Sequence, residues 1–311
     1  MVLGGKKGIY LREQRRKITI ETVMEAFFAA CASVAVFAVV SMTLYLLING
    51  LPGIEKVGLT DIVFRTQWHP TAEEPSYGIW YIILTSAAGT LAAVIIGVPL
   101  GILTAIFLAE FSGKRAVRLV KPAVELLAGI PSVIYGLLGL YLLNPLMYRL
   151  ERKIFEGSQQ HQYTGGANWL SAVVVLAIMI LPTVINVSEI ALRGVNPGIR
   201  EASLGLGATR IQTVFWAVLP AARSGIFTAI VLGVGRALGE AMAIMMVSGN
   251  SVNAPFPFSS VRFLTTALVS EMAYAQGTHR QVLFTIGLVL FVFIMLVNLV
   301  MNAIARNSTR K

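Results

Sequence analysis

Two charged residues interrupt an apolar run in the C-terminal third of the chain. The run Ser224–Val247 contains Arg236 and Glu240, four residues apart. If this run crosses a membrane as a helix, Arg236 lies about 16 Å from its inner end, close to the bilayer midplane. A guanidinium keeps its charge and binds two oxygens of an oxyanion at once. We therefore expect Arg236 to help an anion cross, with Glu240 positioning Arg236 or accepting a hydrogen bond from a protonated oxygen of that anion.

The same pair also has a structural interpretation. Residues four apart share a helical face, so Arg236 and Glu240 are placed to form an ion pair that fixes helix packing. Gly235 and Gly239 have the G-x-x-x-G spacing that lets a neighbouring helix approach closely. A charge inside a bilayer costs about 2.5–3.5 kcal/mol and normally faces a protein interior or a wet cavity. The two interpretations are compatible if the pair exchanges partners, and both stay open.

The loop before this run, about residues 196–220, carries a second pattern. Its members stand at fixed spacing: Glu201, Ala202, Ser203, Gly207, Leu219 and Pro220. Glycine permits a sharp turn, and a short helix held between two spans is suited to fit a groove on a soluble partner. The spacing resembles the EAA loop of ABC importer permeases, E-A-A-x-x-x-G, nine residues, then I-x-L-P. Ser203 replaces the second Ala and Ala217 the Ile. The resemblance implies that Glu201, Ala202 and Gly207 dock an ATPase.

Chemistry of the chain's own is not expected. There is no G-x-x-x-x-G-K-[ST] phosphate loop, and the glycines around Gly235 lack the spacing of a dinucleotide fingerprint. The apolar runs hold no nucleophile–base pair, and the three histidines stand far apart in sequence. We expect no catalytic residue, no metal and no cofactor, so a separate subunit would have to bind ATP.

The composition indicates a membrane protein. Of the 311 residues 56% are hydrophobic and 13% charged, whereas a soluble domain carries about 25% charged residues. Because a helix rises about 1.5 Å per residue, about 20 residues cross the hydrocarbon core. Six runs are long enough, which predicts an all-α protein with six transmembrane helices. The runs are Ala26–Ile48, Ile79–Ala109, Leu126–Tyr148, Gln162–Ser188, Ser224–Val247 and Gln281–Ala305.

The basic residues predict orientation. The net charge is +10, but lysines and arginines flank apolar runs, which indicates membrane topology rather than nucleic-acid binding. Most of the 25 lie on the side of the N-terminus, the 196–220 loop and the C-terminus, so both termini are expected in the cytoplasm. We expect a basic tail at 1–20, a transmembrane domain at 21–305 and a tail at 306–311. On the outer side, Phe263–Ala275 is expected to form a short helix.

Two further segments give the resemblance its detail. The segment Glu125–Gly136, ELLAGIPSVIYG, resembles the third-span signature of phosphate ABC permeases. The segment Gly235–Ala243, GRALGEAMA, followed by Gly249-Asn250, resembles the fifth-span signature of their PstC subunits. Ala241 stands where that family often has Thr. The resemblance extends over about residues 20–305.

The resemblance implies a fold and a set of partners. The fold would be the MetI-like transmembrane domain of a type I ABC importer, forming half of a heterodimeric pore in a bacterial inner membrane. The partners would be a PstA-like second permease subunit, two copies of an ATP-binding subunit, and a periplasmic or lipid-anchored phosphate-binding protein. Phosphate would be the substrate, Arg236 and Glu240 the translocation residues, and Glu201 and Gly207 docking residues. Membrane lipid surrounds such a protein, and nucleic acid is not expected.

Three other functions are compatible with part of these features. An ABC permease for another oxyanion, molybdate or sulfate, would share the 196–220 loop but not the fifth-span signature. An ion-coupled secondary transporter or a channel would explain a midplane Arg–Glu pair equally well. It would not need an ATPase-docking loop. A membrane-bound enzyme would need a reactive pair in the spans, which the sequence does not contain.

Overall fold

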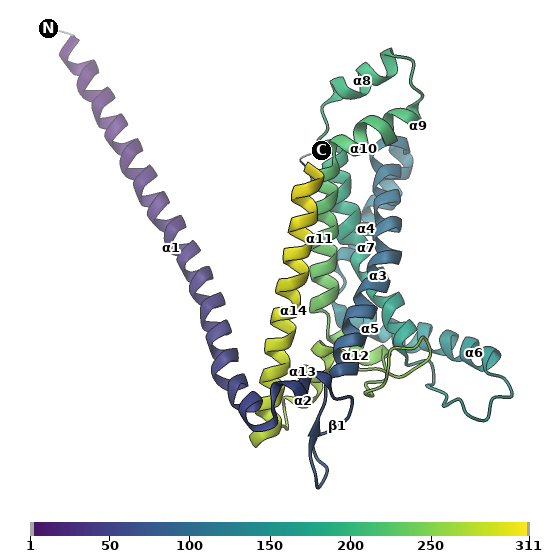
Figure 1. Cartoon of the computed structure of the whole chain (residues 1–311). Helices are drawn as coiled ribbons and strands as arrows, with labels where there is room; N and C mark the ends of the chain where they lie inside the picture. The colour runs from purple at the N-terminus through teal and green to yellow at the C-terminus, as the bar shows by residue number, and fades with distance from the viewer. Residues whose placement is uncertain (1–2, 310–311) are drawn as a thin grey trace.

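The computed structural model describes residues 3–309, with side chains described for 21–113 and 115–305. In this part of the chain, long helices form a bundle with short elements at its two ends (Figure 1). The long helices are α1 (Leu3–Val57), α3 (Trp80–Ile106), α4 (Lys114–Gly129), α7 (Trp169–Arg193), α11 (Arg223–Gly239) and α14 (Gly277–Thr309). Segments labelled η are π-helical: η1 (Phe107–Phe111) continues α3, and η3 (Val214–Val218) precedes α11. The shorter elements are α2 (Leu59–Phe64), β1 (Trp68–His69), β2 (Ser76–Tyr77), α5 (Ser132–Leu138), η2 (Gly139–Leu143), α6 (Asn144–Ile154), α8 (Pro197–Gly205), α9 (Arg210–Thr213), α10 (Leu219–Ala221), α12 (Met242–Val247) and α13 (Leu264–Glu271).

Helix α7 lies at the centre of the bundle because glycines on its neighbours let two helices approach it. A Cβ at Gly97 or Gly101 of α3 would lie 2.7 Å from the side chain of Ile180 or Val184. On α11, a Cβ at Gly233 would lie 2.9 Å from Val184. Such distances leave no room for any larger residue. The close packing of α3, α7 and α11 therefore restricts the side chains that lie between these helices.

The helices have the length and composition of membrane spans. Five helices of the described residues are long and apolar enough to cross a membrane. The number rises to six if Arg210–Ala221 and Arg223–Gly239, bent by 72°, count as one span. The expected all-α membrane fold is confirmed, although two of the spans differ from the predicted runs.

The third predicted span, Leu126–Tyr148, is not continuous. Helix α4 ends at Gly129, Ile130 and Pro131 are extended, and α5 begins at Ser132. A residue before proline is pushed away from helical geometry, which explains the break. The Tyr135 hydroxyl crosses it and donates to the Leu127 carbonyl at 2.6 Å. Beyond the break, α5 and α6 turn away from the bundle axis (Figure 1).

The fifth predicted span, Ser224–Val247, is also broken. Helix α11 ends at Gly239, Glu240 is extended with ψ 129°, and α12 begins at Met242. The apolar run predicted one helix, because its composition does not reveal the local backbone geometry at Glu240. The break places Glu240 at the junction of two helices rather than on the face of one.

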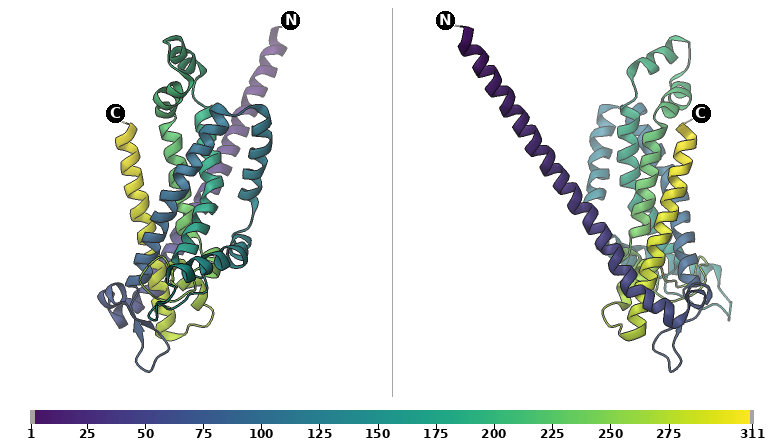
Figure 2. Two further views of the ribbon diagram at one scale, coloured as in Figure 1. Left: turned by 90° about the vertical axis from the view of Figure 1, so that its right-hand side faces the viewer. Right: turned by 60° about the vertical axis from the view of Figure 1, so that its left-hand side comes forward.

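Both ends of the described chain lie at one end of the bundle. The start of α1, the end of α14 and the short helix α8 lie at the same end in the three views (Figures 1 and 2). Helix α1 leans away from the bundle there and meets α14 toward the opposite end, where the Thr285 hydroxyl donates to the Gly50 carbonyl at 2.8 Å. The expected tail at 1–20 has no described side chains, although its backbone from Leu3 is helical.

The opposite end of the bundle carries the β1–β2 hairpin and α13. Trp68 pairs with Tyr77 in the antiparallel hairpin. Their side chains are buried in one apolar cluster with residues of α13 and α14 such as Leu264 and Leu283. The short helix expected within Phe263–Ala275 is confirmed as α13.

Candidate functional site

The 196–220 loop folds into two short helices with a sharp turn between them. The Asn196 side chain caps α8 by accepting from the Gly198 amide at 2.9 Å, and Pro197 occupies the first turn, where a missing N–H costs nothing. Gly207 has φ +87°, which other residues adopt only with strain. Thr209 and Gln212 then form a capping box at the start of α9. The expected turn therefore lies at Gly207.

Arg200 fastens α8 to the bundle. Its guanidinium donates to both carboxylate oxygens of Glu110, the shortest contact being 2.6 Å from Nη2 to Oε1. It also donates to the carbonyls of Val195 at 2.7 Å and Leu192 at 2.8 Å. Charge-assisted bonds of this bidentate kind are strong and geometrically specific. The sequence did not predict this contact. The only indication of it in the sequence is that Glu110 is the first charged residue after the second apolar run.

The predicted docking residues lie on the outside of this fastened loop. Glu201, Ala202 and Gly207 are exposed. Leu206 and Trp216 beside them are 90% and 83% exposed. Large apolar side chains on a rigid, protruding loop are typical of a contact surface for another protein. The three predicted docking residues therefore lie together on one exposed loop. This loop connects the long helices α7 and α11.

Arg236 lies in the middle of the bundle without a carboxylate partner. Its Nη1 donates to the Thr183 hydroxyl of α7 at 3.3 Å. Among the described residues, no ion pair within 4.0 Å includes Arg236. The ion pair with Glu240 that helical spacing suggested does not form, because α11 ends at Gly239. The site is therefore an uncompensated positive charge at mid-span.

Glu240 is held at the helix break by two hydrogen bonds. Its Oε1 accepts from the Ala243 amide at 2.9 Å, which caps the start of α12. Its backbone carbonyl accepts from the Thr265 hydroxyl of α13 at 2.6 Å. A carboxylate at a helix N-terminus is favourably placed for its charge. Glu240 thus links α11, α12 and α13.

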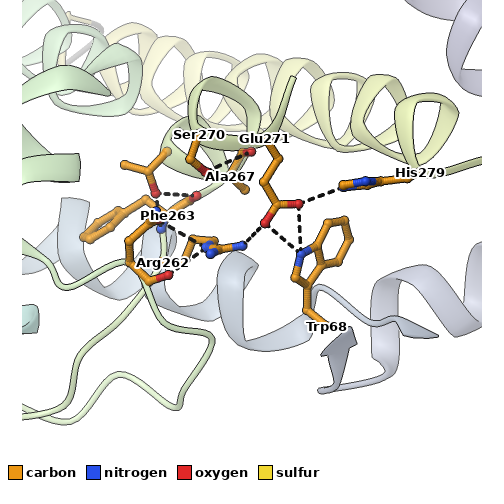
Figure 3. A network of polar contacts seen from close by, with 9 residues as sticks. Trp68, Arg262, Phe263, Ala267, Ser270, Glu271 and His279 are labelled. Atoms are coloured by element: carbon orange, nitrogen blue, oxygen red, sulfur yellow. Dashed lines mark hydrogen bonds and ion pairs between the residues drawn. The ribbon is translucent and has the colours of Figure 1, made fainter. Parts of the chain in front are cut away.

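The C-terminal end of α13 carries a buried polar network that the sequence did not reveal (Figure 3). Glu271, 4% exposed, accepts from Trp68 Nε1 at 3.1 and 3.2 Å. His279 Nε2 lies 2.8 Å from Oε2 of Glu271, and Arg262 forms an ion pair with Oε1. Arg262 also donates to the Asn250 backbone and side-chain oxygens. One carboxylate therefore connects the hairpin, the 248–262 loop, α13 and α14.

Two tyrosines near this network have raised pKa values. Burial raises the pKa of the Tyr77 phenol. For Tyr274, burial and then the Glu271 carboxylate raise the pKa, while Arg262 opposes them. Both phenols consequently stay neutral at ordinary pH. Among the described residues, no group of three or more His, Cys, Asp or Glu side chains is placed to hold a metal ion.

Comparison with known proteins gives the family and relatives over nearly the whole chain. Residues 97–311 match the family of binding-protein-dependent transport system inner membrane components. The probable ABC transporter permease protein YqgH of Bacillus subtilis is 38% identical over 277 residues, 86% of each chain. The phosphate transport system permease protein PstC of Haemophilus influenzae is 32% identical over 283 residues, covering 88% of this chain and 89% of that protein.

Solved structures show the same fold. A bacterial alginate ABC transporter, in complex with its alginate-bound periplasmic protein, superposes with a TM-score of 0.58 at 17% identity, over 89% of this chain and 95% of the other. The inward-facing MetNI methionine ABC transporter gives 0.50 at 20% identity, over 74% and 94%. The chain belongs to the family of inner membrane components of binding-protein-dependent transport systems, as a non-catalytic multi-pass subunit with the fold of an ABC importer transmembrane domain.

Proposed function

We propose that this chain is the permease subunit of an ATP-driven importer of inorganic phosphate and forms half of its pore. The observation that carries the proposal is the Arg236 guanidinium, which lies at mid-span and has no carboxylate partner among the described residues. A charge in this position normally marks a substrate pathway. The names of relatives such as the Haemophilus influenzae permease support phosphate as the anion. Glu240 would act beside Arg236 as an acceptor for a protonated phosphate oxygen.

An open face of α11 supports a second permease subunit as partner. Gly235 and Gly239 are exposed, and a Cβ built on either would meet no atom within 4 Å. Leu232, on the same face, is 49% exposed. Arg236 lies next to this face, so a PstA-like subunit packed against the glycines would place it inside a pore between two chains. The substrate would then cross at the interface and not through one chain.

The 196–220 loop supports coupling to a dimeric ATP-binding subunit. Glu201, Ala202 and Gly207 would contact the ATPase, and the Arg200–Glu110 contact would pass the motion of α8 to η1. Since the start of α1 and the end of α14 lie at the same end of the bundle as α8 (Figure 1), both termini would be cytoplasmic. The hairpin and α13 would face a periplasmic or lipid-anchored phosphate-binding protein.

The test is phosphate uptake by the reconstituted complex with Arg236→Gln. We expect uptake to be abolished while the complex still assembles, because Gln has no charge for the anion. Arg65→Gln is the matched control, since the Arg65 side chain is 65% exposed and follows the last residue of α2. Normal uptake by Arg236→Gln would remove Arg236 from the substrate pathway, and a wild-type complex that takes up no phosphate would overturn the proposed function.

The same preparation separates the alternative functions. Uptake should require ATP and survive an uncoupler while ATP lasts; uptake that follows the ion gradient would indicate a secondary transporter. Competition by sulfate or molybdate stronger than by phosphate would indicate a permease for another oxyanion.

A further inference from the structure

Helix α7 places a threonine hydroxyl beside the unpaired guanidinium. Thr183 Oγ1 accepts from Arg236 Nη1 at 3.3 Å, and both side chains are partly buried. We propose that Thr183 is a second anion-binding residue, which donates its hydroxyl hydrogen to the oxyanion that Arg236 binds. This inference rests on the proposed function, because it assigns a ligand group at the same site.

The hydroxyl of Thr183 is used differently from those of Thr43, Thr104 and Thr228 in the spans. Thr43, Thr104 and Thr228 each donate to the carbonyl four residues earlier, at 2.9, 2.8 and 3.0 Å. Among the described hydrogen bonds, Thr183 accepts one from Arg236 and donates none. A hydroxyl has one hydrogen to donate and two lone pairs to accept with. Thr183 therefore keeps its donor for another group.

The donors of Arg236 are also largely unused. A guanidinium has five N–H donors in a planar fork, and the described contacts of Arg236 engage Nη1 alone. Other partly buried arginines are satisfied: Arg200 holds Glu110 and Arg262 holds Glu271. A cation that is partly removed from water without an ionic partner is less stable than a paired one, and a bound anion relieves this cost. The guanidinium and the adjacent hydroxyl together form a cluster of donors with one positive charge, which suits a tetrahedral oxyanion.

The bond to Arg236 also prepares the hydroxyl for this task. Because its oxygen already accepts from a cation, the hydroxyl hydrogen becomes a better donor to an anion. The same bond holds the guanidinium against α7, whose place is fixed by its packing with α3 and α11. The two donors are thus attached to neighbouring helices in the centre of the bundle.

The decisive variant is Thr183→Val, which removes the hydroxyl and keeps the branched shape. External affinity is set by the binding protein, so the useful quantity is the number of phosphate ions moved per ATP hydrolysed in proteoliposomes. We expect this ratio to fall about tenfold, the effect of losing one hydrogen bond to a charged group, while ATPase stimulation by the phosphate-loaded binding protein persists. Thr183→Ser should restore the ratio, because serine keeps the donor.

Thr104→Val is the matched control. It makes the same chemical change on α3, where the hydroxyl bonds to the helix backbone, and should leave the ratio unchanged. A purely structural role of Thr183 would lower assembly or ATPase activity in Thr183→Val and would not be rescued by serine. If Thr183→Val fails to assemble, Thr183→Ala removes the same hydroxyl with less volume and is judged by the same ratio.

The outcomes separate this inference from the proposed function. If Arg236→Gln abolishes uptake and the valine variant keeps the wild-type ratio, Thr183 is not a ligand and the proposed function stands. Equal losses in the valine and serine variants would also overturn the inference, because they indicate packing. If Arg236→Gln transports phosphate normally, the anion site at Arg236 and Thr183 fails, and phosphate import by the complex still stands.

Discussion

The network around Glu271 predicts a strong dependence of stability on one carboxylate. Glu271 accepts hydrogen bonds from Trp68 and lies against Arg262 and His279. In Glu271→Gln one side-chain oxygen remains for three donors, and the new amide group points its own hydrogens at one of them. Arg262 then keeps only its bonds to the oxygens of Asn250.

The burial of the pair sets the expected magnitude. The side chains of Arg262 and Glu271 are 14% and 6% exposed, so solvent screens the lost interaction weakly. Removing one partner of a buried pair costs about 3–5 kcal/mol. Because Gln retains one acceptor, we expect a loss near the lower end, about 3 kcal/mol of unfolding free energy, which is roughly a hundredfold in the equilibrium constant.

The measurement is reversible unfolding of the purified protein in mixed micelles, followed by tryptophan fluorescence and circular dichroism. Asp61→Asn is the matched control because it neutralises the carboxylate of an ion pair whose side chains are 65% and 44% exposed. Its cost should be about 0–1 kcal/mol. Equal, small losses of unfolding free energy in the two variants would contradict a stabilising role of the Glu271 network at the end of the bundle that carries the hairpin and α13.

Two further predictions concern the two ends of the bundle. Glu201→Lys should weaken co-purification with the ATP-binding subunit in detergent, since it reverses an exposed charge on the 196–220 loop. Glu74→Lys, on the hairpin side, is the control. Unchanged co-purification of the Glu201→Lys variant would contradict docking by Glu201. Because burial raises the folded pKa of Tyr77 above 10.0, its contribution to stability is complete below pH 10 and is lost as the pH rises through the folded pKa. Tyr77→Phe should therefore lose less unfolding free energy than the wild type between about pH 9 and 12, and parallel curves would contradict this.

Local patterns in the sequence predicted the parts of the structure that depend on neighbouring residues. Apolar runs predicted the helices because a bilayer leaves the backbone few alternatives. The spacing around Gly207 predicted the turn between α8 and α9, since a positive φ favours glycine.

Contacts between residues far apart in the chain were not predictable in this way. Glu110 and Arg200 are separated by 90 residues, and Trp68 and Glu271 by 203. The residues that flank each of them in the sequence do not indicate these contacts. Only the packing of α3, α7, α13 and α14 brings the partners together. The break at Pro131 was within reach of local reasoning, because proline restricts the residue before it.

Glu240 does not neutralise Arg236, which favours a functional role for the guanidinium over a structural ion pair. Residues four apart meet only if one helix contains both, and α11 ends between them at Gly239. The structural interpretation of the pair required Glu240 to neutralise Arg236, yet the Glu240 carboxylate accepts from the Ala243 amide instead. The guanidinium is left with one neutral partner, Thr183. It lies next to the face of Gly235 and Gly239, which none of the described residues covers. A positive charge placed this way has its lowest free energy when an anion lies beside it, which is the state that a passing oxyanion would provide.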